Sequence, residues 1–167
     1  MSLSGTVAAD LKLTHVKAGD FVDASLPLVI SSAWTVLNGT GGGQANVLFA
    51  DQRTLGASAT EDLDLAGVLA DIYGALLTFV KLKGVFFRAA AGNTNAVQIT
   101  RPATNGVPLF LAASDGIALG PGEFFLWAAP TGAGKAVTPA TGDLITVTNG
   151  GAGTSVTYDV VLLGTDA

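Results

Sequence analysis

The stretch DLITVTNGGAGTSVTYDVVLL, residues 143–163, carries the clearest structural pattern of the chain. Apolar and polar residues alternate on both sides of the joint NGGAG, residues 149–153. Successive side chains of a β-strand point to opposite faces, so this alternation predicts two half-buried strands. The glycines of the joint tolerate the positive φ angles of a tight reversal. The stretch therefore predicts a β-hairpin. The inward residues predicted for its second strand are Val156, Tyr158, Val160 and Leu162.

Similar alternation, interrupted by Gly, Asn and Pro, recurs upstream and predicts further short strands. These stretches are LPLVISSAWTVLN (26–38), ANVLFADQ (45–52), EDLDLA (61–66), TFVKLKGVFFR (78–88), NAVQIT (95–100) and GEFFLWAA (122–129). The alternation changes at Gly84, which predicts either a β-bulge or a strand that enters a buried position. Only residues 66–77 permit a helix, and their glycines limit it to a short one.

About eight short strands at regular spacing predict an all-β fold, an antiparallel β-sandwich of the jelly-roll-like kind. We assign this sandwich domain to residues 25–167. Residues 1–24 contain no strong pattern beyond DLKLTHV, residues 10–16. They form either an N-terminal arm that packs on a neighbouring molecule or a frayed terminus.

The composition indicates that much of the surface is covered by neutral Ser, Thr, Asn, Gly and Ala or by other subunits. The chain is 49% hydrophobic and 13% charged, with 22 glycines among 167 residues. That charged share is about half of the usual one. Such a chain has little charge with which to keep its whole surface hydrated. We therefore expect self-association, as a dimer or trimer.

Several functional classes are not expected from the composition. A net charge of −5, with the eight basic residues dispersed, argues against nucleic-acid binding, which requires clustered Lys and Arg. The chain has no cysteine, which excludes disulfides and zinc-thiolate sites. The most apolar run, residues 72–87, contains Lys81 and Lys83, so no membrane span is expected. No cofactor is expected either.

The stretch AAPTGAGKAVTP, residues 128–139, superficially resembles a phosphate-binding loop. Such a loop needs a glycine five residues before its Gly-Lys pair and a hydroxyl residue after the lysine. Here Ala129 and Ala136 occupy those positions. The β-branched and proline residues that follow do not begin a helix. The stretch is instead predicted to be a glycine-rich turn between two strands.

Residues with catalytic potential are few. Asp62 and Asp64 lie two apart and share one face of a strand, where a solvated polar face explains them better than a paired-acid site. His15 is the only histidine, and no serine in the chain sits in a nucleophile elbow. We expect no enzyme activity.

The aromatic residues suggest contact surfaces. Phe125 and Trp127 share a phase opposite to that of Phe124 and Leu126, so one of the two pairs is expected to face outward or into a partner. Contact with another subunit is favoured over sugar stacking, because the low charge already requires covered surface. The residues predicted to contact another subunit or a capsid are Leu11, Leu13, Trp34, Phe125 and Trp127.

Four stretches taken together resemble a group of small proteins encoded among the virion structural genes of tailed bacteriophages. These stretches are RTLGASATEDLDLAGVLADIYGALLTF (53–79), RAAAGNTNAVQI (88–99), LGPGEFFLWAAP (119–130) and ATGDLITVTNGGAGTSVTYDVVLLGT (140–165). The resemblance covers the chain from about residue 46 onward. It implies a capsid decoration, or cement, protein built on a jelly-roll-like sandwich, with no catalytic residues.

The resulting expectation is a structural virion protein that is made in the cytoplasm of a bacterial host and binds the capsid surface. Its expected partners are the major capsid protein and further copies of itself. The alternative is a module of a head or tail fibre that recognises a receptor or glycan through exposed aromatic rings.

Overall fold

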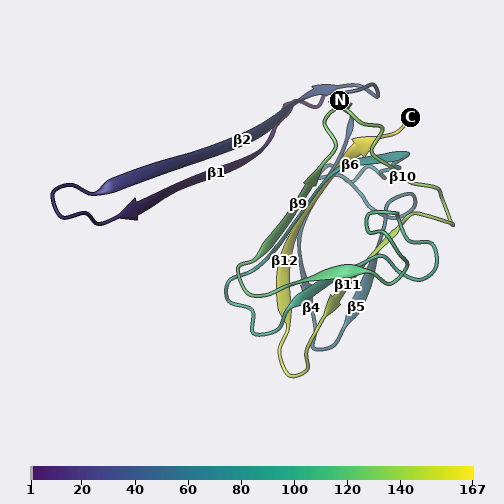
Figure 1. Ribbon diagram of the computed structural model, residues 1–167. Helices are drawn as coiled ribbons and strands as arrows, with labels where there is room; N and C mark the ends of the chain where they lie inside the picture. The colour runs from purple at the N-terminus through teal and green to yellow at the C-terminus, as the bar shows by residue number, and fades with distance from the viewer. Residues whose placement is uncertain (1) are drawn as a thin grey trace.

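The computed structural model describes residues 2–167 and contains twelve β-strands and, within those residues, no helix. A long two-stranded arm projects from a β-sandwich body, and the carboxyl terminus lies at the same end of the body as the root of the arm (Figure 1). The strands are β1 (Gly5–Lys17), β2 (Ala24–Asn38), β3 (Gln44–Ala45), β4 (Val47–Leu55), β5 (Thr60–Asp64), β6 (Lys81–Ala89), β7 (Val97–Thr100), β8 (Gly116–Leu119), β9 (Phe124–Ala128), β10 (Lys135–Ala136), β11 (Leu144–Asn149) and β12 (Val156–Thr165). The all-β prediction is confirmed.

The body consists of two sheets whose strand order is that of a jelly roll. The first sheet runs β4-β12-β6-β9, and β10 continues the edge beyond β9 by pairing with the start of β6. The second sheet runs β5-β11-β7-β8. The antiparallel pairs β4·β12, β5·β11, β6·β9 and β7·β8 follow each other as in one long hairpin that has been rolled up. This arrangement confirms the jelly-roll-like sandwich.

The core lies between the two sheets and follows the predicted alternation. Val156, Tyr158, Val160 and Leu162 are at most 1% exposed on β12, while Ile145 and Val147 are equally buried on β11. Each fully buried side chain of this size contributes about 1.5–3 kcal/mol relative to an exposed one. The inward residues of both strands are as predicted, but the β-hairpin predicted for residues 143–163 is wrong. Strand β11 pairs with β5 and β7 in the second sheet, and β12 pairs with β4 and β6 in the first, so residues 150–155 cross from one sheet to the other. Alternation and a glycine joint identify two strands and a reversal, but they do not specify which strand pairs with which.

The predicted irregularity at Gly84 is a β-bulge in which Lys83 is the extra residue. Leu163 of β12 pairs with Gly84, and Gly164 pairs with Leu82, so Lys83 has no partner on that strand. A Cβ atom on Gly84 would approach the Leu163 Cβ to 3.2 Å. The bulge lets Leu82 and Val85 both enter the core while the Lys83 side chain extends to the opposite face.

The short helix predicted within residues 66–77 is wrong, because this stretch forms turns closed by a bridge between Ala70 and Leu76. The Asp71 carboxylate accepts hydrogen bonds from the amides of Tyr73 and Ala75. Gly74 has a φ of +83°. An aspartate that bonds to nearby amides, followed by a residue in the left-handed region, favours a turn over a helix.

The amino-terminal extension is an ordered hairpin made of β1 and β2, which pair antiparallel from Gly5 opposite Val36 to Lys17 opposite Ala24. The boundary that we placed after residue 24 thus falls at the far turn of the hairpin. Residues 25–38, assigned above to the sandwich, belong to the extension up to its root at Asn38. Alternation identified β2 as a strand, but alternation alone does not show which strand lies beside it.

Candidate interaction surface

The arm is an amphipathic ribbon, because residues paired across it share a face. One face, here the apolar face, is mostly apolar, with Ser32 in its middle and His15 and Lys17 towards the tip. It consists of Val7, Ala9, Leu11, Leu13, His15 and Lys17 on β1 with Ala24, Leu26, Leu28, Ile30, Ser32, Trp34 and Val36 on β2. The reverse face is mostly polar and includes Thr6, Asp10, Lys12, Thr14, Ser25, Ser31 and Thr35. The ribbon therefore presents one surface suited to burial and one suited to water.

At the root of the arm the apolar face is covered by the body. Trp34 and Val36 are 5% and 3% exposed and pack with Ala45 and Leu163 in a small core of their own. The Trp34 Nε1–H donates to the Gly43 carbonyl oxygen at 2.9 Å. The arm is thus anchored to the outer side of the first sheet and not merely connected to it.

Lys83 of the bulge reinforces this root. Its ammonium nitrogen donates to the carbonyl oxygens of Gly41 and Gln44 at 2.8 and 2.9 Å. It also lies 6.0 Å from the centroid of the Trp34 ring, within reach of a cation–π interaction. Burial lowers the pKa of the Lys83 ammonium below its usual value, and the charge of nearby Lys81 lowers it further. The ammonium is bound by main-chain carbonyls of the same chain, so the role of Lys83 is structural.

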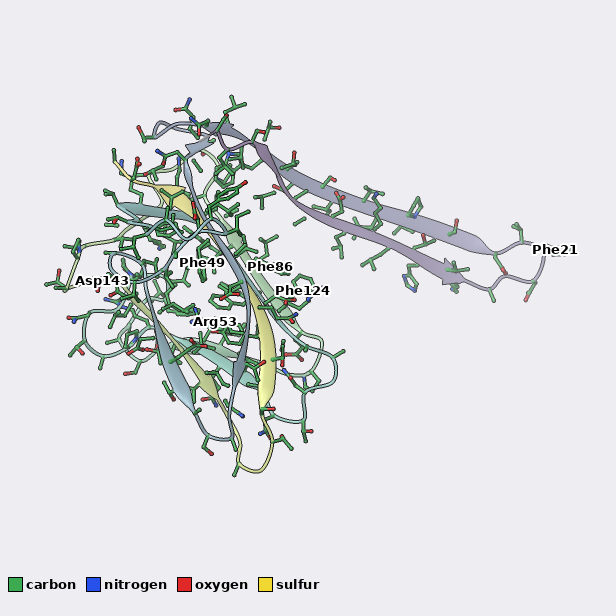
Figure 2. The ribbon with its side chains drawn as sticks, turned by 180° about the vertical axis from the view of Figure 1, so that it is seen from behind. Phe21, Phe49, Arg53, Phe86, Phe124 and Asp143 are labelled. Atoms are coloured by element: carbon green, nitrogen blue, oxygen red, sulfur yellow. The ribbon has the colours of Figure 1, made fainter. Side chains whose placement is uncertain are left out.

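Beyond the root the same apolar face is bare. Leu11, Leu13, Leu28 and Ile30 are 45–56% exposed. At the tip, Phe21 is 103% exposed and points away from the rest of the chain (Figure 2). An isolated two-stranded hairpin is at best marginally stable in water, and a continuous exposed apolar surface is typical of a binding site. The arm face is therefore the strongest candidate for a functional surface.

An apolar groove lies where the arm meets the first sheet. It has a volume of about 400 Å³, and its walls are the arm root from Leu3 to Ala8 and the outer face of the first sheet. The sheet wall includes Leu48, Phe86, Phe124 and Val161. Phe86 and Phe124, with ring centroids 6.2 Å apart, lie on the side of the body from which the arm projects (Figure 2). Among residues 2–167, no charged residue lines this root groove.

A second groove, of about 420 Å³, continues the apolar surface around the body. It lies between strand β4 and the turns of residues 71–77, and it shares Leu3 and Leu48 with the root groove. Ile72, Tyr73 and Leu76 rise beside it and are 72–78% exposed. The exposed apolar surface thus runs from the arm to these turns.

The five predicted contact residues lie in three kinds of place. Leu11 and Leu13 lie on the bare part of the arm. Trp34 lies in the root cluster, and Phe125 and Trp127 are half-buried against the main core. On β9 it is Phe124, 65% exposed, that faces outward. The sequence indicated that one of the two β9 pairs faces outward, and the structure identifies it as the pair containing Phe124.

Several residues of the candidate surface were not predicted from the sequence. They are Leu28 and Ile30 of the arm, Phe21 at its tip and Phe86 in the groove. Leu28 and Ile30 alternate as in any half-buried strand, so they gave no sign that their own chain leaves them bare. Phe21 lies in the glycine- and aspartate-containing turn GDFVD (19–23), where an aromatic residue has no core to enter. The position of Phe21 in this turn is the one indication in the sequence that its side chain is exposed.

The acidic pair and the histidine do not form a reactive centre. Asp62 accepts a hydrogen bond from the Thr146 hydroxyl at 2.5 Å, and Asp64 accepts one from the Ala66 amide at 3.0 Å. His15 lies far out on the arm, opposite Leu26. Within residues 2–167, no group of three or more His, Cys, Asp or Glu side chains is placed to hold a metal ion.

The loop of residues 128–139 is a turn between strands, as predicted. It joins β9 to β10, and both strands pair with β6. Lys135 belongs to β10, and its ammonium lies 5.7 Å from the centroid of the Trp127 ring. Lys135 therefore sits in a strand and not at the start of a helix, where a nucleotide-binding lysine would lie.

The remaining polar clusters hold strands together. The buried Tyr158 hydroxyl donates to Glu61 at 2.7 Å, and Glu61 pairs with Arg53 at 2.9 Å. Burial and the bond to Glu61 raise the pKa of Tyr158 far above its usual value. Hydrogen bonds from Gln52 and Arg88 lower the pKa of Asp159. These groups connect β4, β5, β6 and β12 across both sheets.

Comparison with known proteins found no matching family model, no matching curated protein and no matching solved structure. Over residues 2–167 there is also no helix that is long and apolar enough to cross a membrane. The function must therefore be inferred from the surface of the molecule.

Proposed function

We propose that this chain is a non-enzymatic structural protein of a tailed-phage virion that decorates and stabilises the capsid. In this proposal it is made in the cytoplasm of the bacterial host and binds the capsid surface through contacts with the major capsid protein and with other copies of itself. The uncovered apolar face of the arm is the observation that carries the proposal. The resemblance of residues 46–167 to virion proteins is the reason for proposing a capsid as the structure that the chain binds.

The surfaces of the chain suit such a role. A decoration protein acts by burying surface across neighbouring subunits, and mass action at many identical sites then favours the assembled shell over its separated subunits. The arm can reach across a subunit boundary, because its 13 paired positions extend about 43 Å at roughly 3.3 Å per residue. The low charge of the chain keeps the desolvation cost of such contacts small.

The alternative of a glycan-binding fibre module receives little support from the two tryptophans. Trp34 is buried, and its N–H is already bonded to the chain. Trp127 is half-buried and lies near the Lys135 ammonium. Sugar recognition requires open ring faces beside polar groups. Specific retention on a glycan array, lost in Trp127→Ala, would favour the alternative.

The test is addition of the purified chain to capsid shells assembled without it. We expect the chain to sediment with the shells at micromolar concentration and to raise their melting temperature. An arm-face variant, Leu13→Asp with Ile30→Asp, should bind at least about tenfold more weakly, because each carboxylate would be desolvated in the contact.

The matched control is a reverse-face variant, Thr14→Asp with Val29→Asp. It places two carboxylates on the other side of the same ribbon, where Val29 is 64% exposed. This variant should bind shells as the unmodified chain does. Failure of the unmodified chain to bind shells, or equal binding by the two variants, would count against the proposed role of the arm.

A further inference from the structure

We propose that the root groove binds the arm of a second copy of this chain, so that the protein assembles by exchange of arms. The inference rests on the proposed function and deepens it by naming the partner of one surface. The groove and the arm belong to the same chain, and both are bare in a single copy. One kind of contact between copies covers both surfaces in every copy.

The two surfaces match in chemistry. The root groove is lined by Leu, Val, Phe, Ala, Gly, Ser and Thr, and no charged residue in the described part of the chain lines it. The arm face from Ala9 to Leu13, with Leu28 to Ser32 opposite, is likewise uncharged. The chain has a net charge of −5, so copies repel each other over most of their surface. Contact between these two uncharged surfaces therefore has the smallest cost in electrostatic repulsion and in desolvation of charged groups.

The shapes also correspond. The sheet wall of the groove is the outer face of a β-sheet, on which Phe124 stands 65% exposed beside Phe86. A β-ribbon laid on such a face forms a further sandwich layer about 10 Å away, which is the normal spacing of packed sheets. The arm is a ribbon with one apolar face, and so has the form that completes this layer.

The size of the contact is sufficient for a stable assembly. The bare part of the ribbon, from Ala9 to Lys17, presents a face of about 30 Å by 10 Å, on which His15 and Lys17 lie beyond the uncharged part. Exchange buries an arm and a groove on every copy, or roughly 600 Å² per copy, which is the lower end of the range for specific interfaces. A two-fold pair or a small ring closes without leaving an arm bare.

A second copy is favoured over a different protein as the occupant. A different protein would have to supply one surface for the arm and another for the groove. The chain itself already contains both halves. The root groove also adjoins the packed cluster that contains Trp34 and Val36. The arm of a second copy that binds in the groove therefore extends this cluster.

The experiment measures the mass of the purified chain in solution by sedimentation over a range of concentrations. The variants are the arm-face variant, the reverse-face variant and a groove variant, Phe124→Asp. Phe124 is largely exposed, so its replacement leaves the core in place. We expect the unmodified chain and the reverse-face variant to associate equally. The arm-face and groove variants, each alone, should associate at least about tenfold more weakly.

Mixing the two weakened variants is the decisive step. The arm-face variant retains an intact groove, and the groove variant retains an intact arm, so the mixture should form mixed oligomers through one restored contact. This result does not depend on whether the altered arm keeps its hairpin. A mixture that stays monomeric would overturn the inference, as would a groove variant that associates like the unmodified chain.

The same measurements separate this inference from the proposed function. An unmodified chain that remains monomeric yet binds capsid shells overturns arm exchange and leaves the decoration role standing. A chain that exchanges arms as described but ignores the shells overturns the decoration role alone. Arm-to-arm packing would be recognised by weakened association in the arm-face variant only, which contradicts the groove as the site.

Discussion

Lys83 of strand β6 lies against Trp34 of strand β2, with its ammonium nitrogen 6.0 Å from the centroid of the indole ring. The same ammonium bonds to the carbonyls of Gly41, in the loop that follows the arm, and of Gln44, at the start of β3. The bulge that frees Lys83 from the pairing of β6 with β12 makes this contact possible. One irregularity in the sandwich therefore fixes the root of the arm.

Replacing Lys83 by Met should destabilise the protein by about 1–3 kcal/mol, because the Gly41 and Gln44 carbonyls lose their buried donor. Relief of the cost of burying a charge offsets part of this loss. Unfolding in denaturant measures the difference. Lys81→Met, on the same strand, is the control and should stay within about 0.5 kcal/mol of the unmodified chain. Equal effects of the two substitutions would contradict the role given to Lys83.

Replacing Gly134 by Ala should cost more than 1 kcal/mol, because Gly134 has a φ of +74° and a Cβ atom there would lie 2.3 Å from the Leu82 carbonyl oxygen. Gly132 lies in the same loop, and a Cβ atom on it would meet no atom closer than 3.9 Å. Gly132→Ala is thus the matched control and should be nearly neutral. Thermal unfolding of the two variants distinguishes them, and similar melting temperatures would contradict this description of the β9–β10 turn.

The Tyr158 hydroxyl makes stability fall at alkaline pH. Its pKa is raised in the folded protein from the ordinary value of 10.0. Below pH 10 both states carry the proton, so the contribution is fully present. Above pH 10 the unfolded state loses the proton while the folded state keeps it, and the free energy of unfolding falls by about 1.4 kcal/mol per pH unit.

Comparison with Tyr158→Phe isolates this effect, because other groups titrate equally in both proteins. The variant should be less stable by about 1.5–3 kcal/mol at pH 7, since it lacks the bond to the Glu61 carboxylate. The difference between the two proteins should shrink as the pH rises above 10. Denaturant unfolding at several pH values measures it, and a difference that stays constant up to pH 11 would refute the assignment.

Much of the body could be predicted from the sequence. Alternation around residues 149–153 gave the strands β11 and β12 with the correct inward residues, although the two strands lie in different sheets and do not form the predicted hairpin. The change of pattern at Gly84 gave the bulge as one of two alternatives. These features depend on local spacing, which the two-residue period of a strand imposes directly.

The rest depends on contacts that local spacing does not contain. The partner of β2 is β1 and not a strand of the sandwich, and nothing in the alternation of β2 distinguishes the two. The helix expected within residues 66–77 gave way to turns because the Asp71 side chain bonds to the amides of Tyr73 and Ala75. The bare state of Leu13 and Ile30 is visible only once the whole fold is known.

The central claim is that the apolar face of the arm is a binding surface. Amide hydrogen exchange at protein concentrations below and above association tests it most directly. Amides of residues 9–13 and 28–32 should exchange at least about tenfold more slowly in the associated protein, while those of Trp34 and Val36 at the root stay protected at both concentrations. Arm amides that exchange equally fast at both concentrations, in a protein whose mass shows that it has associated, would contradict the claim.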